Sequence, residues 1–255
     1  MKILVLGGTE EARILAEQLV KMGHAVTTSL AGRTSAPLTP PGELHVGGFG
    51  GAQGLADFLR KNAFDRLVDA THPYAVKMAN HAVEAAKANG LRCVRLVRPA
   101  WSEPQYAFWN TVPSPEAAAL SLPTGSRVLL TVGHTGLETF LARADCTFLV
   151  RVIEPPEKPL PANARLIVAR PPFFEGSETE LMQSEAVTHL VTKNSGGVQT
   201  EAKLNAAQKL RVAVIMIARP ALPPAHEVPT VGRAIAALQL VAPEARAEAP
   251  RAQTG

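Results

Sequence analysis

The sequence predicts an α/β protein with two parallel-sheet domains, and three observations lead to this fold class. Strand-like apolar runs alternate with amphipathic helical segments along most of the 255 residues. A stretch rich in Pro, Trp and Ser, roughly 99–115, interrupts the alternation near the middle of the chain. Aromatic residues make up only 5% of the sequence, whereas Ala, Val and Leu are abundant, which suits helices packed on sheets.

The first series begins with a strand, a glycine turn, a helix and a second strand. Residues 3–6 form a continuous apolar run, which is typical of a buried parallel strand, and residues 10–22 carry apolar side chains at helical spacing. Thr9 is suited to cap this helix, and Gly23 is suited to end it. The series continues with expected strands at 25–30, 66–70 and 92–97 and expected helices at 53–62 and 74–89.

A second series follows the interruption and predicts a second domain. Its expected strands are 128–132, 147–153, 165–169, 188–192 and 212–217, and its expected helices are 137–144, 177–185, 199–210 and 230–241. We therefore expect an N-terminal domain at 1–98 and a C-terminal domain at 116–242, joined by a linker at 99–115. Residues 243–255 are expected to be a disordered tail, and a cleft is expected between the domains.

The net charge, the cysteines and the lengths of the apolar runs indicate which kinds of ligand and surroundings suit this protein. The net charge of +4 is diffuse, so it fits a small anionic ligand and argues against nucleic acid, which favours a dense basic stripe. Cys93 and Cys146 stand alone, without the spacing of a metal site or a disulfide framework. No signal peptide and no apolar run of about 18 residues is visible, so we expect a cytoplasmic protein that does not enter a membrane. We expect a monomer or a weak homodimer.

The glycine turn after the first strand is a candidate nucleotide site. Glycines let the backbone approach a phosphate, and the following helix N-terminus supplies N–H groups and a positive dipole end. The pattern is not a complete G-x-G-x-x-G, and many α/β proteins with such a turn bind nothing there. The candidate cofactor contacts at this turn are Gly7, Gly8, Thr9 and Glu10.

The end of the second strand favours NADPH over NADH. NAD enzymes usually place an acidic residue about 20 positions past the glycines, where it holds the ribose hydroxyls. Residues 25–38 contain no acidic residue, and Arg33, Thr34 and Ser35 stand there instead. An arginine with neighbouring hydroxyls suits a 2′-phosphate, although Arg33 could also be a solvated loop residue. The missing carboxylate also argues against a methyltransferase that binds S-adenosylmethionine.

Two further polar loops stand at expected strand ends, where doubly wound sheets bind their ligands. The first holds Asp69, Thr71, His72 and Tyr74. His72 could donate a proton or bind a carboxylate, and Thr71 could contact the cofactor. Alternatively, Thr71 and His72 only cap the next helix. The Tyr-x-x-x-Lys pair of some dehydrogenases is absent, because Met78 stands where the lysine would be.

The second polar loop covers residues 192–203 and combines two glycines and two lysines with hydroxyl and amide groups. Such a set at a helix start suits an anion. Lys193 at the strand end is the stronger candidate, while Lys203 could equally be a surface residue of the helix. Gly133 and His134, in a turn of the second domain, are expected to face the same crevice.

Together, these motifs resemble the precorrin-6A/cobalt-precorrin-6A reductase family of cobalamin biosynthesis. The resemblance rests on residues 7–13, 31–33, 69–75, 193–203 and 215–220, and it runs in matching order from about residue 1 to 240. It implies two Rossmann-like domains with cofactor and substrate between them. It also implies an NADPH-dependent reduction of one double bond of precorrin-6A to precorrin-6B, with hydride added to C19 and a proton to C18. A related branch acts on the cobalt-loaded substrate, and some members favour NADH.

The residues are compatible with this chemistry. Precorrins carry many acetate and propionate arms, so basic groups suit the substrate; Arg170 is a further basic candidate. Nothing in the sequence demands a metal or a flavin, because a nicotinamide alone can deliver a hydride. The catalytic candidates are His72, Tyr74 and Lys193, with bound water as a further proton donor. The cofactor candidates are Gly7, Gly8, Thr9, Glu10, Arg33, Thr34, Ser35, Thr71, Gly133 and His134. The substrate candidates are Lys193, Asn194, Ser195, Gly196, Thr200, Lys203 and Arg219.

Two other functions stay open from the residues alone. A non-catalytic dinucleotide sensor would explain the glycine turn and Arg33 but would leave the Lys193 loop without a role. A two-domain transferase that uses a nucleotide-sugar donor would share the fold.

Overall fold

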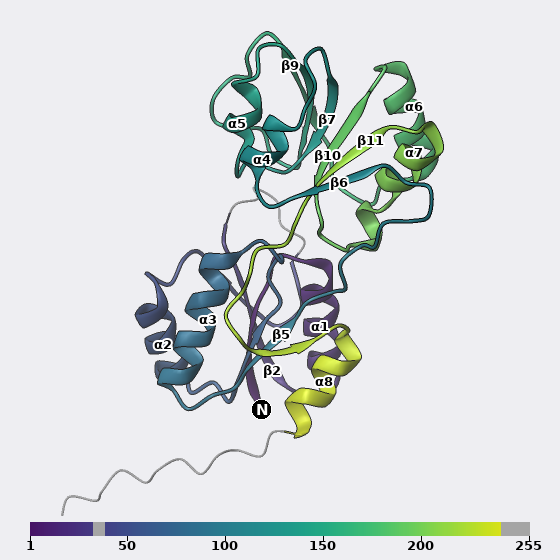
Figure 1. Cartoon of the computed structure of the whole chain (residues 1–255). Helices are drawn as coiled ribbons and strands as arrows, with labels where there is room; N and C mark the ends of the chain where they lie inside the picture. The colour runs from purple at the N-terminus through teal and green to yellow at the C-terminus, as the bar shows by residue number, and fades with distance from the viewer. Residues whose placement is uncertain (33–38, 241–255) are drawn as a thin grey trace, which may run out of the picture. The chain divides into compact units, whose positions relative to one another are not determined.

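The computed structural model describes residues 1–32 and 39–240, which form two compact α/β units (Figure 1). Unit 1 contains the described residues up to 97 together with those from 222 onward, and unit 2 contains residues 98–221. Each unit is built on one sheet of six parallel strands. The expected fold class, two parallel-sheet α/β domains, is confirmed.

Unit 1 has helices on both faces of its sheet. Its elements are β1 (Lys2–Leu6), α1 (Glu10–Lys21), β2 (Ala25–Leu30), β3 (Glu43–Val46), α2 (Ala52–Lys61), β4 (Arg66–Asp69), α3 (Val76–Ala88), β5 (Cys93–Leu96), β12 (His226–Val228) and α8 (Val231–Leu240). Side chains alternate along β1, so Ile3 and Val5 pack with α1 and α8, whereas Leu4 and Leu6 pack with α2 and α3. This burial on both faces explains why β1 is an uninterrupted apolar run.

Unit 2 repeats this layered arrangement. Its elements are β6 (Trp109–Val112), α4 (Pro115–Leu120), β7 (Arg127–Thr131), α5 (Leu137–Leu141), β8 (Thr147–Val152), β9 (Ala164–Val168), α6 (Glu175–Ser184), β10 (His189–Lys193), the short 3-10 helix η1 (Val198–Thr200), α7 (Ala202–Leu210) and β11 (Ala213–Ile217). Met182 of α6 and Leu204 of α7 share a core with Leu190 of β10. Helix α4 contacts β6 and β11.

The C-terminal segment belongs to unit 1, which differs from the expected division of the chain. Strand β12 pairs in parallel with β5, placing His226 beside Val94, and the Val97 N–H donates to the Val228 carbonyl at 3.0 Å. Helix α8 buries Ala234 and Leu238 in the core of unit 1. The apolar face of this helix is visible in the sequence, but the sheet that it covers is not, because that choice depends on a pairing between residues 132 positions apart.

The stretch at 99–115 is also more than a linker. It contains β6, which pairs with β11 and sets Trp109 beside Val214 at one edge of the sheet of unit 2. Ser114 then caps α4, since its Oγ accepts a hydrogen bond from the Ala117 N–H at 3.2 Å. Strands β3, β6 and β12 were not predicted because each has only three or four residues, many of them polar and exposed.

Two sequence expectations can be compared with the described residues, and two others cannot. Both cysteines, Cys93 and Cys146, are buried and unpaired. Among the described residues no helix combines the length and apolar character that crossing a bilayer requires. The expected disordered tail at 243–255 lies outside the described residues, as do Arg33, Thr34 and Ser35.

Candidate active site

The glycine turn after β1 is fixed against β2 and leaves open space over Gly8. The Gly7 N–H donates to the Ser29 carbonyl at 2.8 Å, and a Cβ on Gly7 would lie 2.9 Å from Cγ2 of Thr28. Gly8 has a φ of 106°, a conformation that favours glycine, and no heavy atom lies within 4 Å of where its Cβ would be. A ligand can therefore approach this backbone closely at the start of α1, where the helix dipole favours an anion.

Glu10 and Glu11 occupy the first turn of α1 and bring negative charge to the same place. The Glu10 carboxylate lies 4.0 Å from the Arg13 guanidinium, which offsets part of that charge. Because a carboxylate repels a phosphate, any contact of Glu10 with a pyrophosphate is assigned to its backbone rather than to its side chain.

The Thr9 hydroxyl joins two loops and uses its single proton and one of its two acceptor positions in doing so. It accepts from the Ala12 N–H at 3.1 Å, which confirms Thr9 as the N-cap of α1, and it donates to the Ala70 carbonyl at 2.8 Å. Ala70 directly follows β4, the neighbour of β1 in the sheet. Thr9 therefore contributes to a ligand site by holding its two loops together.

The loop after β4 is organised by a buried carboxylate. Asp69 is 2% exposed, and its Oδ1 accepts from the Thr71 hydroxyl at 2.7 Å and from the Thr71 N–H at 3.2 Å. Its Oδ2 accepts from Nε of Arg95 at 3.1 Å, and the Arg95 side chain is 3% exposed. Arg95 lies in β5, which pairs with β4, so a buried ion pair from β5 positions the loop that follows β4.

His72 and Tyr74 stand side by side in this loop. Their ring centroids are 5.5 Å apart, and the Tyr74 N–H donates to Nδ1 of His72 at 3.3 Å. With Nδ1 as acceptor, the hydrogen-bond pattern assigns the proton of the neutral imidazole to Nε2. Both side chains are partly exposed.

The order of the strands brings the two loops of unit 1 together. The order is β12-β5-β4-β1-β2-β3, so the chain leaves β1 toward β2 on one side and returns to β4 on the other. The carboxyl ends of β1 and β4 therefore flank the point where the strand order reverses, and ligands of such sheets bind at this point. The glycine turn and the Asp69 loop both lie there.

Unit 2 has an equivalent reversal between β7 and β10. The turn with Gly133 and His134 follows β7, and the Lys193 loop follows β10. Gly133 has a φ of 71°, and Nε2 of His134 is 2.7 Å from the Glu154 carbonyl oxygen. The expected cofactor residues Gly133 and His134 are thus at the ligand-binding edge of unit 2, whereas the other described cofactor candidates are in unit 1.

Arg219 holds the Lys193 loop in place. Its guanidinium donates to three backbone carbonyls, those of Asn194 at 2.8 Å, Arg98 at 2.9 Å and Ser195 at 3.2 Å. The Asn194 side chain in turn accepts from the Trp101 N–H at 2.7 Å and donates to the Trp101 carbonyl at 3.0 Å. These bonds make Arg219 and Asn194 part of the scaffold of the loop, and the expected contacts of both residues with the substrate stay predictions.

Lys203 is likewise internal. It is 4% exposed, its Nζ donates to the Thr200 carbonyl at 2.6 Å, and the same Nζ lies 4.8 Å from the Trp101 ring centroid. Burial, together with the nearby positive charge of Arg151, lowers the pKa of Lys203 to about 7. These contacts make Lys203 a support of the loop, and its expected contact with the substrate stays a prediction.

Lys193, Ser195 and Gly196 complete the loop at the end of β10. Lys193 is partly exposed, and burial lowers the pKa of its amine. The Ser195 side chain is largely buried, at 8% exposure for the residue. Arg170, the further basic candidate, is ion-paired with Glu154, its NH2 lying 2.6 Å from Oε1.

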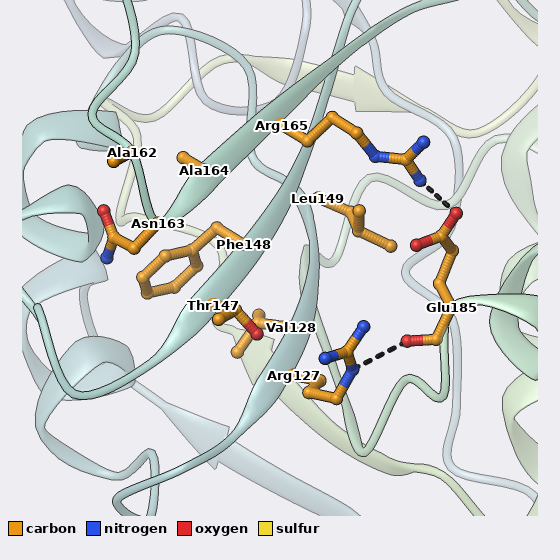
Figure 2. A pocket seen from close by; sticks show the side chains of 10 residues that line it. All are labelled: Arg127, Val128, Thr147, Phe148, Leu149, Ala162, Asn163, Ala164, Arg165 and Glu185. Carbon is orange, nitrogen blue, oxygen red and sulfur yellow. Dashed lines mark hydrogen bonds and ion pairs between the residues drawn. The ribbon is translucent and has the colours of Figure 1, made fainter.

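A separate hollow lies at the opposite edge of the sheet of unit 2, at the amino ends of β7, β8 and β9 (Figure 2). Arg127 donates from Nε to the Glu185 carbonyl at 2.8 Å, and Arg165 pairs with the Glu185 carboxylate. Parallel sheets of this kind bind ligands at the carboxyl ends of their strands, so this hollow is distinct from the candidate site.

The sequence matches the family described as precorrin-6x reductase CbiJ/CobK over residues 2–239. The chain belongs to this family. Membership in the precorrin-6x reductase family decides between the three functions left open by the residues, because it makes the protein an oxidoreductase of tetrapyrrole biosynthesis rather than a sensor or a sugar transferase.

Three proteins that are similar to this chain over most of its length carry names that fit this family. The precorrin-6A reductase of Rhodococcus erythropolis is 45% identical over 228 residues, covering 89% of this chain and 92% of the relative. The precorrin-6A reductase of Rhodobacter capsulatus is 43% identical over 87% of this chain and 89% of the relative. The cobalt-precorrin-6A reductase of Synechocystis sp. is 32% identical over 86% of this chain and 88% of the relative.

A solved structure of the family has the same fold. It is described as CobK precorrin-6A reductase, superposes with a TM-score of 0.90 at 40% identity, and covers 96% of this chain and 99% of that chain. Membership in the precorrin-6x reductase family also implies a nicotinamide cofactor, because reduction of a double bond needs a hydride source.

The sequence pattern does not reveal three residues that support the candidate loops, Arg95 in unit 1 and Arg98 and Trp101 in unit 2. Arg95, Arg98 and Trp101 make contacts through segments far apart in sequence, and Arg98 donates from Nε to the Ser195 carbonyl at 2.6 Å. A charged residue inside the apolar strand 93–96 was the one available signal for Arg95, because a buried arginine needs a partner.

Proposed function

We propose that this chain reduces one carbon–carbon double bond of cobalt-free precorrin-6A with a hydride from NADPH, giving precorrin-6B. The observation that carries the proposal is the 45% identity to the Rhodococcus erythropolis precorrin-6A reductase across nearly the whole of both chains. The cobalt-free substrate is favoured because the Synechocystis relative, named for cobalt-precorrin-6A, is 32% identical.

The open backbone at Gly8 fits a dinucleotide. A side chain at this position would enter the space next to the start of α1, where a pyrophosphate would meet the dipole of the helix. Gly8 would let that phosphate approach, Gly7 lets the turn pack closely against β2, and Thr9 keeps the turn joined to the β4 loop. A bound nicotinamide supplies the hydride.

The preference for NADPH rests on the sequence after β2. Residues 25–38 lack a carboxylate for the ribose hydroxyls, and Arg33, Thr34 and Ser35 suit a 2′-phosphate. Arg33→Ala should therefore weaken NADPH binding by about tenfold or more while changing NADH binding little. Fluorescence titration with both cofactors measures this, and an equal loss for both would remove the 2′-phosphate assignment.

For the substrate, Lys193 is the basic residue that the geometry favours. It stands at the carboxyl end of β10, partly exposed, on a loop fixed by Arg219. Its ammonium would pair with an acetate or propionate arm of the macrocycle. His72 is the candidate for delivering a proton to the ring, as an imidazolium that gives up one of its two ring protons and becomes the neutral imidazole. The backbone N–H of Tyr74 donates to Nδ1 of the neutral ring.

The test is turnover with a defined macrocycle. Purified protein should oxidise NADPH, followed at 340 nm, only when precorrin-6A is added, and mass spectrometry should show a gain of two hydrogens in the product. Cobalt-precorrin-6A is the comparison substrate, and faster turnover with it would move the chain to that branch. Absence of turnover with both macrocycles would refute the proposal.

A further inference from the structure

The hydroxyl groups of Thr9 and Thr71 stand in adjacent loops but differ in what they can offer a ligand. Thr9 donates to one backbone carbonyl and accepts from one backbone N–H, so its proton and one acceptor position are used. Thr71 makes hydrogen bonds only to Asp69 among the described residues. The two side chains therefore differ as hydrogen-bonding groups, although the residue type is the same.

The direction of the Thr71 hydrogen bond is fixed by its partner. A carboxylate that pairs with a guanidinium can accept hydrogen bonds but cannot donate one. The Thr71 hydroxyl, 2.7 Å from Oδ1 of Asp69, must therefore give its single proton to Asp69. What the hydroxyl still has to offer is its lone pairs, so Thr71 can act toward a ligand only as an acceptor.

Arg95, whose side chain is buried, holds the Asp69 carboxylate in this orientation. Its Nε donates to Oδ2 of Asp69, and its NH1 donates to the Pro223 carbonyl at 2.7 Å and to the Glu227 carboxylate at 3.0 Å. Pro223 and Glu227 belong to the C-terminal segment that returns to unit 1. The segment thereby helps to orient Arg95, and Arg95 orients the acceptor oxygen of the β4 loop through Asp69.

The place of Thr71 in the sheet indicates which half of a dinucleotide it meets. A sheet with this strand order binds one nucleotide over each half, with the pyrophosphate at the turn after β1. The 2′-phosphate assignment puts the adenosine on the β2 side, so the other nucleotide falls on the β4 side, where Thr71 lies. The donors of that nucleotide are the carboxamide NH2 and the ribose hydroxyls.

We infer that the Thr71 hydroxyl is a dedicated hydrogen-bond acceptor for a donor group of the nicotinamide nucleotide, with Asp69 and Arg95 as the positioning residues that fix its orientation. This inference rests on the proposed NADPH-dependent function. It explains why a buried carboxylate and a buried arginine are placed behind the loop, where apolar residues would otherwise complete the core.

The test compares Thr71→Val with Thr71→Ser. Valine keeps the shape of the side chain and removes the acceptor, so the dissociation constant for NADPH should rise about tenfold, the effect of one lost hydrogen bond. Serine should restore binding to within about twofold of wild type. Thr124→Val is the matched control, because the Thr124 hydroxyl likewise donates to a carboxylate, Oδ2 of Asp145 at 3.0 Å, but lies in unit 2; this variant should bind NADPH as wild type does.

A second measurement identifies the donor group of the dinucleotide. The oxidised phosphorylated dinucleotide and its 3-acetylpyridine analogue, which carries a methyl group instead of the carboxamide NH2, are titrated against wild type and Thr71→Val. If the effect of valine disappears with the analogue, the carboxamide is the donor. If the effect persists, a ribose hydroxyl is the donor.

The inference is overturned if Thr71→Val binds NADPH as wild type does while the fold, checked by circular dichroism, is intact. It is also overturned if serine fails to rescue, because that would show a packing role for the methyl group. Failure of the proposed function is distinguishable from both results, since wild-type protein would then bind no dinucleotide or turn over no precorrin.

Discussion

The Thr9 hydroxyl donates to the Ala70 carbonyl at 2.8 Å and so ties the turn after β1 to the turn after β4. The two residues are 61 positions apart in sequence, yet their strands are hydrogen-bonded neighbours in the sheet. This bond sets the separation of the two loops that flank the reversal of strand order in unit 1. The two loops at this candidate edge of unit 1 are therefore held together by the protein itself.

Thr9→Ala should weaken both the fold and the cofactor site. Loss of the N-cap costs about 1 kcal/mol of stability, and loss of the bond to Ala70 adds a comparable amount. Ser114→Ala is the matched control, because it removes the N-cap of α4 in unit 2 and no bond between loops. Thermal unfolding and NADPH titration of both variants should show the larger destabilisation, and the only loss of affinity, for Thr9→Ala. Equal behaviour of the two would show that the bond to Ala70 has no effect.

Gly196→Ala should disrupt the Lys193 loop. Gly196 has a φ of 70°, and a Cβ there would lie 1.9 Å from the Pro99 carbonyl oxygen and 2.7 Å from the Arg219 guanidinium. Gly197→Ala is the neighbouring control, since its φ is −87° and its Cβ would lie 3.3 Å from Nε of Arg98. We expect poor soluble yield or loss of turnover for Gly196→Ala and a mild effect for Gly197→Ala. Normal turnover by Gly196→Ala would contradict the assigned packing.

Arg219→Lys should loosen the same loop while keeping the charge. An ammonium cannot reproduce the fork that reaches the carbonyls of Asn194, Arg98 and Ser195, so about 1–3 kcal/mol of stability should be lost. If Lys193 binds the substrate from this loop, the KM for precorrin-6A should rise while NADPH affinity stays the same. The exposed Arg92→Lys serves as control. A change in NADPH affinity alone would indicate that Arg219 acts elsewhere.

Lys203→Met should change how stability depends on pH. The pKa of Lys203 is about 7 in the folded protein and 10.5 in its ordinary state, so between these values the unfolded chain binds more protons than the folded one. Stability from this group therefore rises with pH across that window and is lowest below about pH 7. The difference in Tm, wild type minus Lys203→Met, should increase from pH 7 toward pH 10.

Lys77→Met, at an exposed position on α3, controls for the loss of one charge. Its Tm difference from wild type should change little over the same pH range. A flat Tm difference for Lys203→Met would mean that Lys203 is charged and solvated in the folded protein, which would contradict the burial that the structure shows.

Much of the fold could be predicted from the sequence because local pattern determines it. The run at 3–6, the glycines after it and the apolar spacing at 10–22 predict a strand, a turn and a helix, and the structure has β1, the Gly7–Gly8 turn and α1 there. Short polar strands at the sheet edges could not be predicted, because three or four partly exposed residues carry no clear periodicity. The same limit hid the return of β12 and α8 to unit 1.

The candidate site likewise has features that the sequence predicts and others that it does not. The loops with His72 and Lys193 could be found from the sequence because glycines and polar residues follow apolar strands there, and the structure places both at carboxyl strand ends. The roles of Arg219 and Lys203 could not be found, because a basic residue has the same appearance in sequence whether it faces a ligand or a backbone carbonyl.

The two α/β series, the polar loops at their strand ends and the resemblance to a family of reductases can all be found in the sequence alone. These features depend on residues that are neighbours in the chain and on the residue types within each motif. The tertiary structure decided which sheet receives each edge strand and which polar groups are already satisfied. Hydrogen bonds such as those from Thr9 to Ala70, from Arg95 to Asp69 and from Arg95 to Glu227 join segments that meet only after folding. What each side chain can still offer a ligand follows from those bonds, since a donor or acceptor already used within the protein is not free to recognise anything else.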